Sequence, residues 1–240
     1  MHDILTDELV NEIHNYINEA DKVLVGLGME WNSLVNVKES FLNGDFENIK
    51  MSDLISKKDV MISDTSERII AYQNLKKLLQ EKNYYIISLC DDDVIYEIFD
   101  DNDNVVTPCG GYRFLQCGQH IMSRDEVVIK DGKPICPICG GNLSYNNIKN
   151  ENYMEESYLS KFNDYKGWLQ STINKKLVIL ELGTDMRFPQ VIRFAFDRLI
   201  KFNLKSKMYR VNKSLYMVDS SAEGRGIAVK CDSLELVKKM

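Results

Sequence analysis

The chain has 240 residues, of which 44% are hydrophobic and 28% charged, a composition that indicates a globular protein rather than a disordered one. A net charge of -6 without a long basic run argues against a nucleic-acid-binding surface, because phosphate neutralisation needs clustered Lys and Arg. The apolar stretches are too short to span a membrane, and the N-terminus lacks the pattern of a signal peptide. With six cysteines and no secretory signal, we expect a cytoplasmic protein in which metal ligation is favoured over disulfides.

Hydrophobic periodicity predicts helices alternating with strands along most of the chain. In chain order we expect a helix over 5–17, a strand over 23–25, weak helical pieces at 37–42 and 51–55, a helix over 67–79, a strand over 84–89, a strand and turn over 127–134, a helix over 158–173, a strand over 177–182, a helix over 188–202, strands over 207–211 and 227–229, and a helix over 233–239. This alternation predicts an α/β fold with a Rossmann-type, doubly wound parallel sheet.

Two pairs of potential metal ligands interrupt the alternation. Cys136 and Cys139 lie two residues apart from each other in the turn Cys-Pro-Ile-Cys, which closes on two glycines, and this is the form of a zinc knuckle. Cys117 and His120 repeat the spacing, and fifteen residues separate His120 from Cys136. Three sulfurs and one nitrogen are a ligand set that structural Zn²⁺ prefers, although Cys109 is an alternative to His120 as the fourth ligand. The competing interpretation is a set of reduced, metal-free thiols.

The ligand pairs define the expected domain organisation. Residues 116–149 form a small zinc-ribbon module, inserted into one larger domain that comprises residues 1–115 and 150–240. In such a sheet ligands bind at the carboxyl ends of the strands. Four turns there are candidates, namely Gly26–Gly28, Ser88–Asp93, Cys109–Gly111 and Gly183–Asp185. The first has glycines that would let backbone amides approach a pyrophosphate, but two glycines after a strand are also common in tight turns.

The order of these turns around a zinc ribbon resembles the sirtuins, which are NAD-dependent protein deacylases and ADP-ribosyltransferases. The local match is closest to the bacterial branch linked to macrodomain proteins. The resemblance extends from about residue 20 to 230 and is weakest over 32–66. The segments that carry it are Tyr112–Cys117, Leu180–Gly183, Phe188–Phe194 and Arg210–Asn212.

The resemblance implies NAD as cofactor, a structural Zn²⁺ ion and a protein acceptor as substrate. The acceptor in this branch is associated with macrodomains or lipoyl carriers, and neither nucleic acid nor membrane is involved. The pocket is expected between the strand-end turns and the zinc module. The residues that the resemblance assigns to cofactor binding are Gly26, Gly28, Met29, Cys90, Asp92, Gly183, Thr184 and Asn212, and those that it assigns to catalysis are Cys90, Asp92 and Cys109.

Several residues depart from the family pattern. Met29, Glu30 and Trp31 replace small residues and a serine, and a carboxylate there would repel pyrophosphate unless it turns away. Asp92 is retained as the candidate for the nicotinamide amide. Cys90 replaces the asparagine beside the reacting ribose, and Cys109 replaces the catalytic histidine.

These departures decide which reaction we expect. Cysteine is a poor substitute for a histidine base, because its usual pKa near 8.5 leaves little thiolate at neutral pH. Since transfer depends mainly on positioning, the sequence favours an NAD-dependent protein ADP-ribosyltransferase over an efficient deacylase. Two alternatives stay open, namely that both cysteines are buried fillers and that the chain is a catalytically degenerate binding or scaffold module. The acidic residues of 91–103 are expected to form a solvated surface rather than a cation site.

Overall fold

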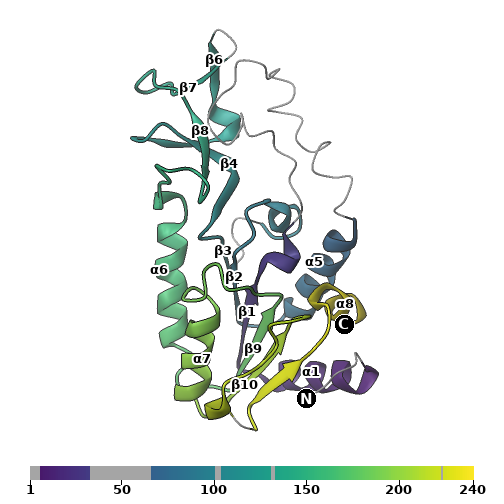
Figure 1. Cartoon of the computed structure of the whole chain (residues 1–240). Helices are drawn as coiled ribbons and strands as arrows, with labels where there is room; N and C mark the ends of the chain where they lie inside the picture. Colours follow the sequence, from purple (N-terminus) through teal and green to yellow (C-terminus); the bar gives the residue numbers. More distant parts are fainter. Residues whose placement is uncertain (1–5, 33–65, 101–103, 131–132, 223) are drawn as a thin grey trace.

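The computed structural model describes residues 6–32, 66–100, 104–130, 133–222 and 224–240 (Figure 1). The helical pieces expected at 37–42 and 51–55 lie outside these described residues. Of the remaining elements, those outside the region between β3 and α6 are α1 (Asp7–Glu19), β1 (Lys22–Leu27), η1 (Met29–Trp31), α5 (Ser66–Leu79), β2 (Tyr84–Ser88), η3 (Val94–Glu97), β3 (Val105–Val106), α6 (Glu156–Gln170), β9 (Leu177–Leu182), α7 (Arg193–Phe202), β10 (Ser206–Val211), η5 (Ser220–Ala222), β11 (Gly226–Val229) and α8 (Ser233–Lys239).

Six of the strands form one parallel sheet in the order β11-β10-β9-β1-β2-β3, which confirms the predicted fold class. Successive residues of β1 point to opposite faces of the sheet. Val23 and Val25 pack with residues of α1, α5 and α8, whereas Leu24 packs with residues of α6 and α7. The two sets of helices lie on opposite sides of the sheet (Figure 1). Apolar side chains therefore cover both faces of the central strands, which is why those strands read as continuous hydrophobic runs.

The region between β3 and α6 forms smaller antiparallel sheets. Strands β5 (Ile121–Ser123), β4 (Gly110–Gln116) and β8 (Ser144–Asn147) make a three-stranded sheet, and β6 (Val128–Lys130) pairs with β7 (Lys133–Ile135). η4 (Arg124–Glu126) connects two of them. This sheet has its own small core around Tyr112 and Tyr145, whose rings meet edge to face at 5.0 Å between centroids. A strand and a turn between the two ligand pairs were predicted. β6 confirms the strand, whereas residues 131–132 of the predicted turn lie outside the described residues.

Several predicted boundaries differ by a few residues, as at α6, which covers Glu156–Gln170 rather than 158–173, and three differences bear on the site. β1 continues through Gly26 to Leu27, so Gly26 belongs to the sheet and not to the following turn. α7 begins at Arg193 rather than at residue 188, because Phe188 and Pro189 precede it in a turn in which the Phe194 amide donates to the Pro189 carbonyl at 2.7 Å. Gly110 begins strand β4 rather than ending a turn. Strand β3 was not predicted, since two residues are too short to give a period.

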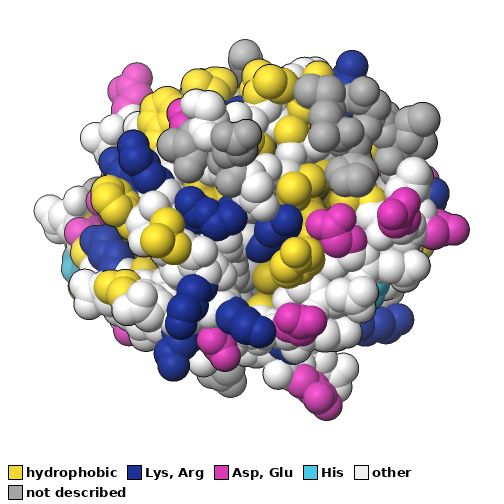
Figure 2. Space-filling view, turned by 90° about the horizontal axis from the view of Figure 1, so that it is seen from below, with side chains coloured by type: hydrophobic (Ala, Val, Ile, Leu, Met, Phe, Trp, Pro, Cys, Tyr) yellow, Lys and Arg dark blue, Asp and Glu magenta, His cyan; other side chains and the backbone are white. Residues whose placement is uncertain are grey.

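The amino ends of the parallel strands form the edge opposite the candidate site. Exposed hydrophobic side chains lie there on two loops, with Ile173 on one and Phe202 and Leu204 beside the other. Asn203 joins the loops by donating to the Thr172 carbonyl at 2.9 Å. Figure 2 views the molecule from this end and shows hydrophobic side chains interspersed with Lys and Arg. Within the described part of the chain, no helix combines the length and apolar character needed to cross a membrane.

Candidate active site and metal centre

The turns that follow β1, β2 and β9 meet along the carboxyl edge of the sheet. The Gly28 amide donates to the Leu182 carbonyl at 2.8 Å, and the Gly183 amide donates to the Val211 carbonyl at the same distance. On the other side of β1, the Cys90 thiol donates to the Gly28 carbonyl at 3.4 Å. The predicted site residues that this line of contacts brings together are Cys90, Gly28, Gly183, Thr184 and Asn212.

Close backbone packing explains two of the glycines. A Cβ on Gly28 would lie 2.2 Å from the Cα of Thr184, and a Cβ on Gly183 would lie 2.5 Å from the Cβ of Glu30. Gly183 also has a φ of +65°, a conformation that side chains disfavour. The two turns therefore approach each other as closely as backbone allows, and only glycine permits it at either position.

Gly26 has a different neighbourhood from the one predicted. It pairs within β1, and a Cβ there would lie 2.6 Å from both Ile192 and Phe196 at the start of α7. Its missing side chain thus lets α7 pack against the sheet. Met29 is half-buried and packs against the same side of the core.

Glu30 turns its carboxylate toward the first residue of α8. Its Oε2 accepts hydrogen bonds from the Ser233 hydroxyl at 2.7 Å and the Ser233 amide at 3.2 Å, and its Oε1 accepts from the Lys213 amide at 3.3 Å. The neighbouring Trp31 is fully buried and donates from Nε1 to the Ser233 hydroxyl at 3.1 Å. The carboxylate therefore has hydrogen-bond donors of its own, and it lies beside Gly183.

Both cysteines at the predicted catalytic positions are buried. Burial raises the pKa of the Cys90 thiol well above its usual value, and nearby Asp92 raises it further. The Tyr72 hydroxyl lies 3.9 Å from the Cys90 sulfur. Burial and then Asp91 raise the pKa of Cys109 to about 12, although Arg187 opposes this. Both groups are therefore neutral thiols at physiological pH, and neither supplies a thiolate nucleophile or a base.

The acidic turn after β2 is not the solvated surface that we expected. Asp91 and Asp92 are buried, and Asp91 forms an ion pair with Lys149 at 2.7 Å. The Asn32 side chain makes two hydrogen bonds of 3.0 Å with Asp91. It donates to the Asp91 carboxylate and accepts from the Asp91 backbone amide. The Asp92 carboxylate accepts from the Val94 amide at 3.1 Å. These contacts fix the turn. Further along the acidic run, Asp100 is exposed as expected, and Asp101 and Asp103 lie outside the described residues.

Asn212 and Thr184 use their side chains to join strand ends. Asn212 donates to the Thr184 carbonyl at 2.9 Å and accepts from the amides of Ser214 and Leu215, both at 2.8 Å. The Thr184 hydroxyl donates to the buried Glu181 carboxylate. The hydrogen-bonding groups that the resemblance assigns to the nucleotide thus hold the edge of the sheet together.

A buried ion-pair network lies beneath this edge. Glu181 of β9 pairs with Arg210 of β10 at 2.7 Å and with Arg193 of α7 at 3.4 Å. Arg210 also pairs with Asp197 at 2.8 Å and donates to the Met217 carbonyl at 2.9 Å. The network orders residues 213–217 against the sheet. Glu181 and Arg210 lie in different strands, 29 residues apart in the sequence, and no local pattern predicts their pairing.

The four predicted zinc ligands converge. The donor atoms of Cys117, His120, Cys136 and Cys139 all lie within 4.8 Å of one another. The Cys117 sulfur is 3.6 Å from both His120 Nδ1 and the Cys139 sulfur, and the Cys136 sulfur is 3.7 Å from His120 Nδ1. Bonds of about 2.3 Å to sulfur and 2.0–2.1 Å to nitrogen at tetrahedral angles require ligand separations of this size. The cluster therefore fits Zn²⁺. Cys109 packs instead in the hydrophobic cluster that includes Leu24 of β1 and Tyr165 of α6.

Comparisons with known proteins agree with this architecture. A Sir2 enzyme structure aligns with a TM-score of 0.58 at 12% identity, covering 98% of this chain and 96% of the other. A Sir2 homologue in complex with NAD gives 0.56 at 10% identity, covering 99% and 93%, and a Sir2 protein bound to acetylated peptide gives 0.57 at 14%, covering 96% of each. The chain has a sirtuin fold. No family model matches the sequence.

In sequence, this chain is similar to a curated protein of Staphylococcus aureus (strain Mu50), a protein ADP-ribosyltransferase. The identity is 25% over 185 aligned residues, and the match covers 70% of this chain. The match covers 59% of that relative, so the chain spans about three fifths of its length.

The backbone at the carboxyl edge of the sheet suits a dinucleotide, but the charge at that edge does not. The glycines at Gly28 and Gly183 leave the strand-end turns free of side chains, as close phosphate approach needs. However, the amide of Gly28 and that of Glu30 already donate to the carbonyls of Leu182 and Gly183. The Glu30 carboxylate adds negative charge at the same turn. The sequence indicated that Glu30 would repel phosphate unless it turned away, but not that Ser233, 203 residues away, would hold it beside Gly183.

Proposed function

We propose that this chain is an NAD-binding protein of sirtuin type that transfers ADP-ribose to a protein acceptor and is not an efficient deacylase. The observation that carries the proposal is the state of the two cysteines. Buried, neutral thiols stand where the family resemblance assigns the ribose-side asparagine and the histidine base. Deacylation needs that base, whereas transfer depends on positioning and on stabilising a developing positive charge.

Asp92 is the retained residue around which this activity is proposed. Its carboxylate is buried and held by the Val94 amide, which presents it in a fixed orientation for the nicotinamide amide. The name of the Staphylococcus aureus relative supports transfer, and the solved structures with NAD and with acetylated peptide support a dinucleotide and a protein acceptor. By family resemblance, the acceptor belongs to a macrodomain- or lipoyl-carrier-associated system and the protein is cytoplasmic.

The cysteine and histidine cluster has a structural part in this proposal. Zn²⁺ held by Cys117, His120, Cys136 and Cys139 would tie the end of β4 to β5 and β7, which have three residues each. Structural zinc supplies folding energy to small sheets of this kind. The ion is not assigned any step in the reaction.

The placement of Glu30 favours a second candidate, a binding module that no longer turns over NAD. A carboxylate anchored at the Gly183 turn lowers affinity for any phosphate there. Loss of both nicotinamide release and acceptor labelling would be the signature of this candidate.

Incubation with NAD labelled in its adenylate part, together with a lysate, tests the proposal. Labelled protein and released nicotinamide, with both lost in Asp92→Asn, support transfer. Deacetylation of an acetyl-lysine peptide as fast as that of ordinary sirtuins would refute it. If neither activity appears, calorimetry with NAD and ADP-ribose decides whether the module still binds nucleotide.

A further inference from the structure

The amino edge of the large sheet carries exposed hydrophobic side chains that the proposed function does not use. Strands β9 and β10 are neighbours, and the segments before them carry Ile173, Phe202 and Leu204, which are 68%, 79% and 75% exposed. Asn203 joins the two segments by donating to the Thr172 carbonyl at 2.9 Å. Asn203 has an extended backbone and a buried side chain, so Phe202 and Leu204 on either side of it face outward. We name the three exposed residues the amino-edge patch.

Lysines surround the amino-edge patch. Lys175 lies two residues after Ile173, and Lys201 and Lys205 lie at either end of the other segment. All three lysines are exposed, and none of them forms an ion pair with another described residue. Figure 2, which views the molecule from this end, shows Lys and Arg between the hydrophobic side chains. The surroundings of the patch are therefore cationic, although the whole chain has a net charge of -6.

Acidic side chains at the same edge lie beside α1 and engage a different lysine. Glu19 pairs with Lys176 at 3.6 Å, and the Asp21 carboxylate accepts from the Lys176 amide at 2.9 Å. The lysines around the patch are thus not neutralised by these two acids.

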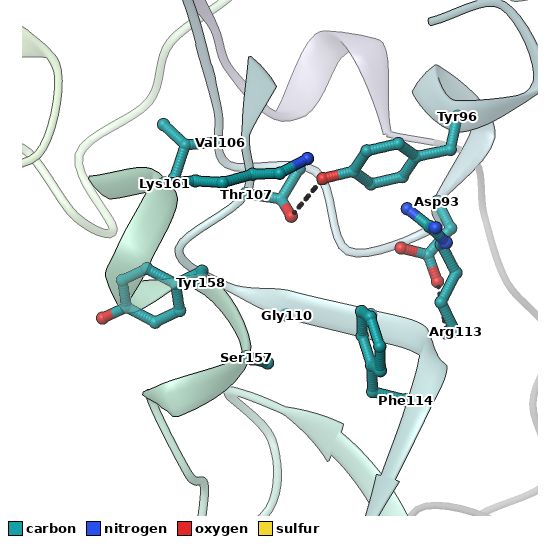
Figure 3. Close-up of a pocket in the computed structure, with 11 residues that line it drawn as sticks. Asp93, Tyr96, Val106, Thr107, Gly110, Arg113, Phe114, Ser157, Tyr158 and Lys161 are labelled. Carbon is teal, nitrogen blue, oxygen red and sulfur yellow. Dashed lines mark hydrogen bonds between the residues drawn. The ribbon is translucent and has the colours of Figure 1, made fainter. Parts of the chain in front are cut away.

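The cations of a cavity near the carboxyl end of β3 differ in this respect. The cavity has a volume of about 200 Å³ and lies between α6, η3 and the start of β4 (Figure 3). The Arg113 guanidinium lies 4.1 Å from the centre of the Tyr96 ring, and the Lys161 ammonium lies 5.9 Å from the same ring. These cations already lie against an aromatic ring, whereas the lysines of the amino edge are exposed to solvent.

The size and the charge of the amino-edge patch together favour one kind of partner. Three side chains of this size offer on the order of 300–400 Å² of apolar surface, whereas a stable protein interface takes about 800 Å² from each partner. We propose that the patch docks on an anionic lipid surface, with its three apolar side chains in the interfacial region and Lys175, Lys201 and Lys205 at the headgroups. Shallow insertion needs little apolar area, because basic residues add an attraction to anionic lipids.

The proposed contact is peripheral and independent of the NAD-dependent function. It differs from the expectation, drawn from the resemblance alone, that no membrane is involved. Because the patch lies at the amino ends of the strands, the docked protein keeps the carboxyl edge, with Gly28 and Gly183, turned away from the lipid.

Sedimentation of the full chain with lipid vesicles tests the proposal. We expect binding to phosphatidylcholine vesicles that contain about 30% phosphatidylserine, weaker binding at high salt, and none to phosphatidylcholine alone. Phe202→Ser should weaken the binding about tenfold through lost apolar contact, and Lys205→Gln about fivefold through lost charge. Both side chains are exposed, so neither change should alter the melting temperature appreciably.

Matched controls remove the same groups elsewhere. Phe194→Ser changes a phenylalanine that is 46% exposed at the other end of α7, and Lys130→Gln changes an exposed lysine of β6. Both variants should sediment with the anionic vesicles like the wild type.

Three results would overturn the proposal: no sedimentation with anionic vesicles at millimolar lipid, equal binding to phosphatidylcholine alone, or losses in Phe194→Ser and Lys130→Gln as large as those in Phe202→Ser and Lys205→Gln. An amphipathic peptide of Glu and Leu provides a further arm. If it binds in a manner that depends on Phe202 while the vesicles do not bind, the lipid assignment is wrong and the patch recognises an acidic protein surface.

Discussion

Replacing Glu30 with Gln should strengthen nucleotide binding while destabilising the protein. The change keeps the size of the side chain and removes its charge. A Glu30 oxygen lies 2.9 Å from the position of a Cβ on Gly183, so a phosphate held at that turn would be its close neighbour. At 4 Å, Coulomb's law gives about 1 kcal/mol per charge pair in water and about 4 kcal/mol at an effective dielectric constant of 20. Because about 1.4 kcal/mol is a tenfold change, NAD should bind roughly tenfold more tightly.

The same substitution removes a charged acceptor from three hydrogen bonds. Glu30 accepts from the hydroxyl and amide of Ser233 and from the Lys213 amide. Hydrogen bonds to charged groups contribute about 1.5–3 kcal/mol, and Gln keeps part of this. We expect a loss of about 1–2 kcal/mol in the free energy of unfolding, measured by urea denaturation.

Calorimetry with NAD and ADP-ribose on the wild type and on Glu30→Gln gives the decisive comparison. The control is Glu19→Gln, which removes an equal charge from a side chain that is 71% exposed and pairs with Lys176 at the opposite edge of the sheet. It should leave both affinity and stability nearly unchanged. If Glu30→Gln folds but binds NAD no better than the wild type, the argument that this carboxylate opposes phosphate fails.

Three further outcomes are expected. Purified protein should contain about one zinc per chain, and His120→Ala should lower both that content by elemental analysis and the melting temperature, whereas His14→Ala should not lower the zinc content. With its pKa near 12, Cys109 should react with iodoacetamide at pH 7.5 about a thousandfold more slowly in the folded than in the unfolded protein, as read by peptide mass spectrometry. Burial raises the pKa of Asp93 to about 7, with opposing contributions from the Tyr112 and Arg113 amides and the Arg113 charge. Since the folded state then binds the proton more tightly, Asp93 should make stability fall as pH rises from about 4 to 7, and Asp93→Asn should flatten that slope in denaturation curves.

The sheet could be predicted because each of its long strands is marked by the residues of the strand itself. Strands such as Leu177–Leu182 are continuous apolar runs since both of their faces are covered, and the pattern gave this strand its observed bounds. The metal ligands could also be predicted, because the spacing of Cys136 and Cys139 in the sequence is that of a zinc knuckle. Gly26 shows the limit of such patterns. From the sequence, a glycine that ends a strand cannot be told from one that lets a helix pack closely against the strand. The position of α7 against Gly26 decides between the two.

The candidate site was less predictable because its charges find partners far away in the chain. Asp91 looked like part of a solvated acidic run, yet Lys149 and Asn32 hold it in the interior. Asp93 looked the same, yet it adopts a left-handed conformation with φ of 60° and caps two amides of β4. Composition identifies the charge, but the topology decides whether it is paired.

Glu30 and Trp31 connect the stability of the fold to the nucleotide edge. Both residues bind the Ser233 hydroxyl, so the turn after β1 and the start of α8 are held by one shared group. The buried Trp31 ring also packs edge to face on Tyr72, with 4.9 Å between centroids. Moving Glu30 away from Gly183 would therefore disturb the contacts of α8 with the core. The carboxylate that opposes phosphate is thus also one that stabilises this edge, which is why the affinity and stability of Glu30→Gln should change in opposite directions.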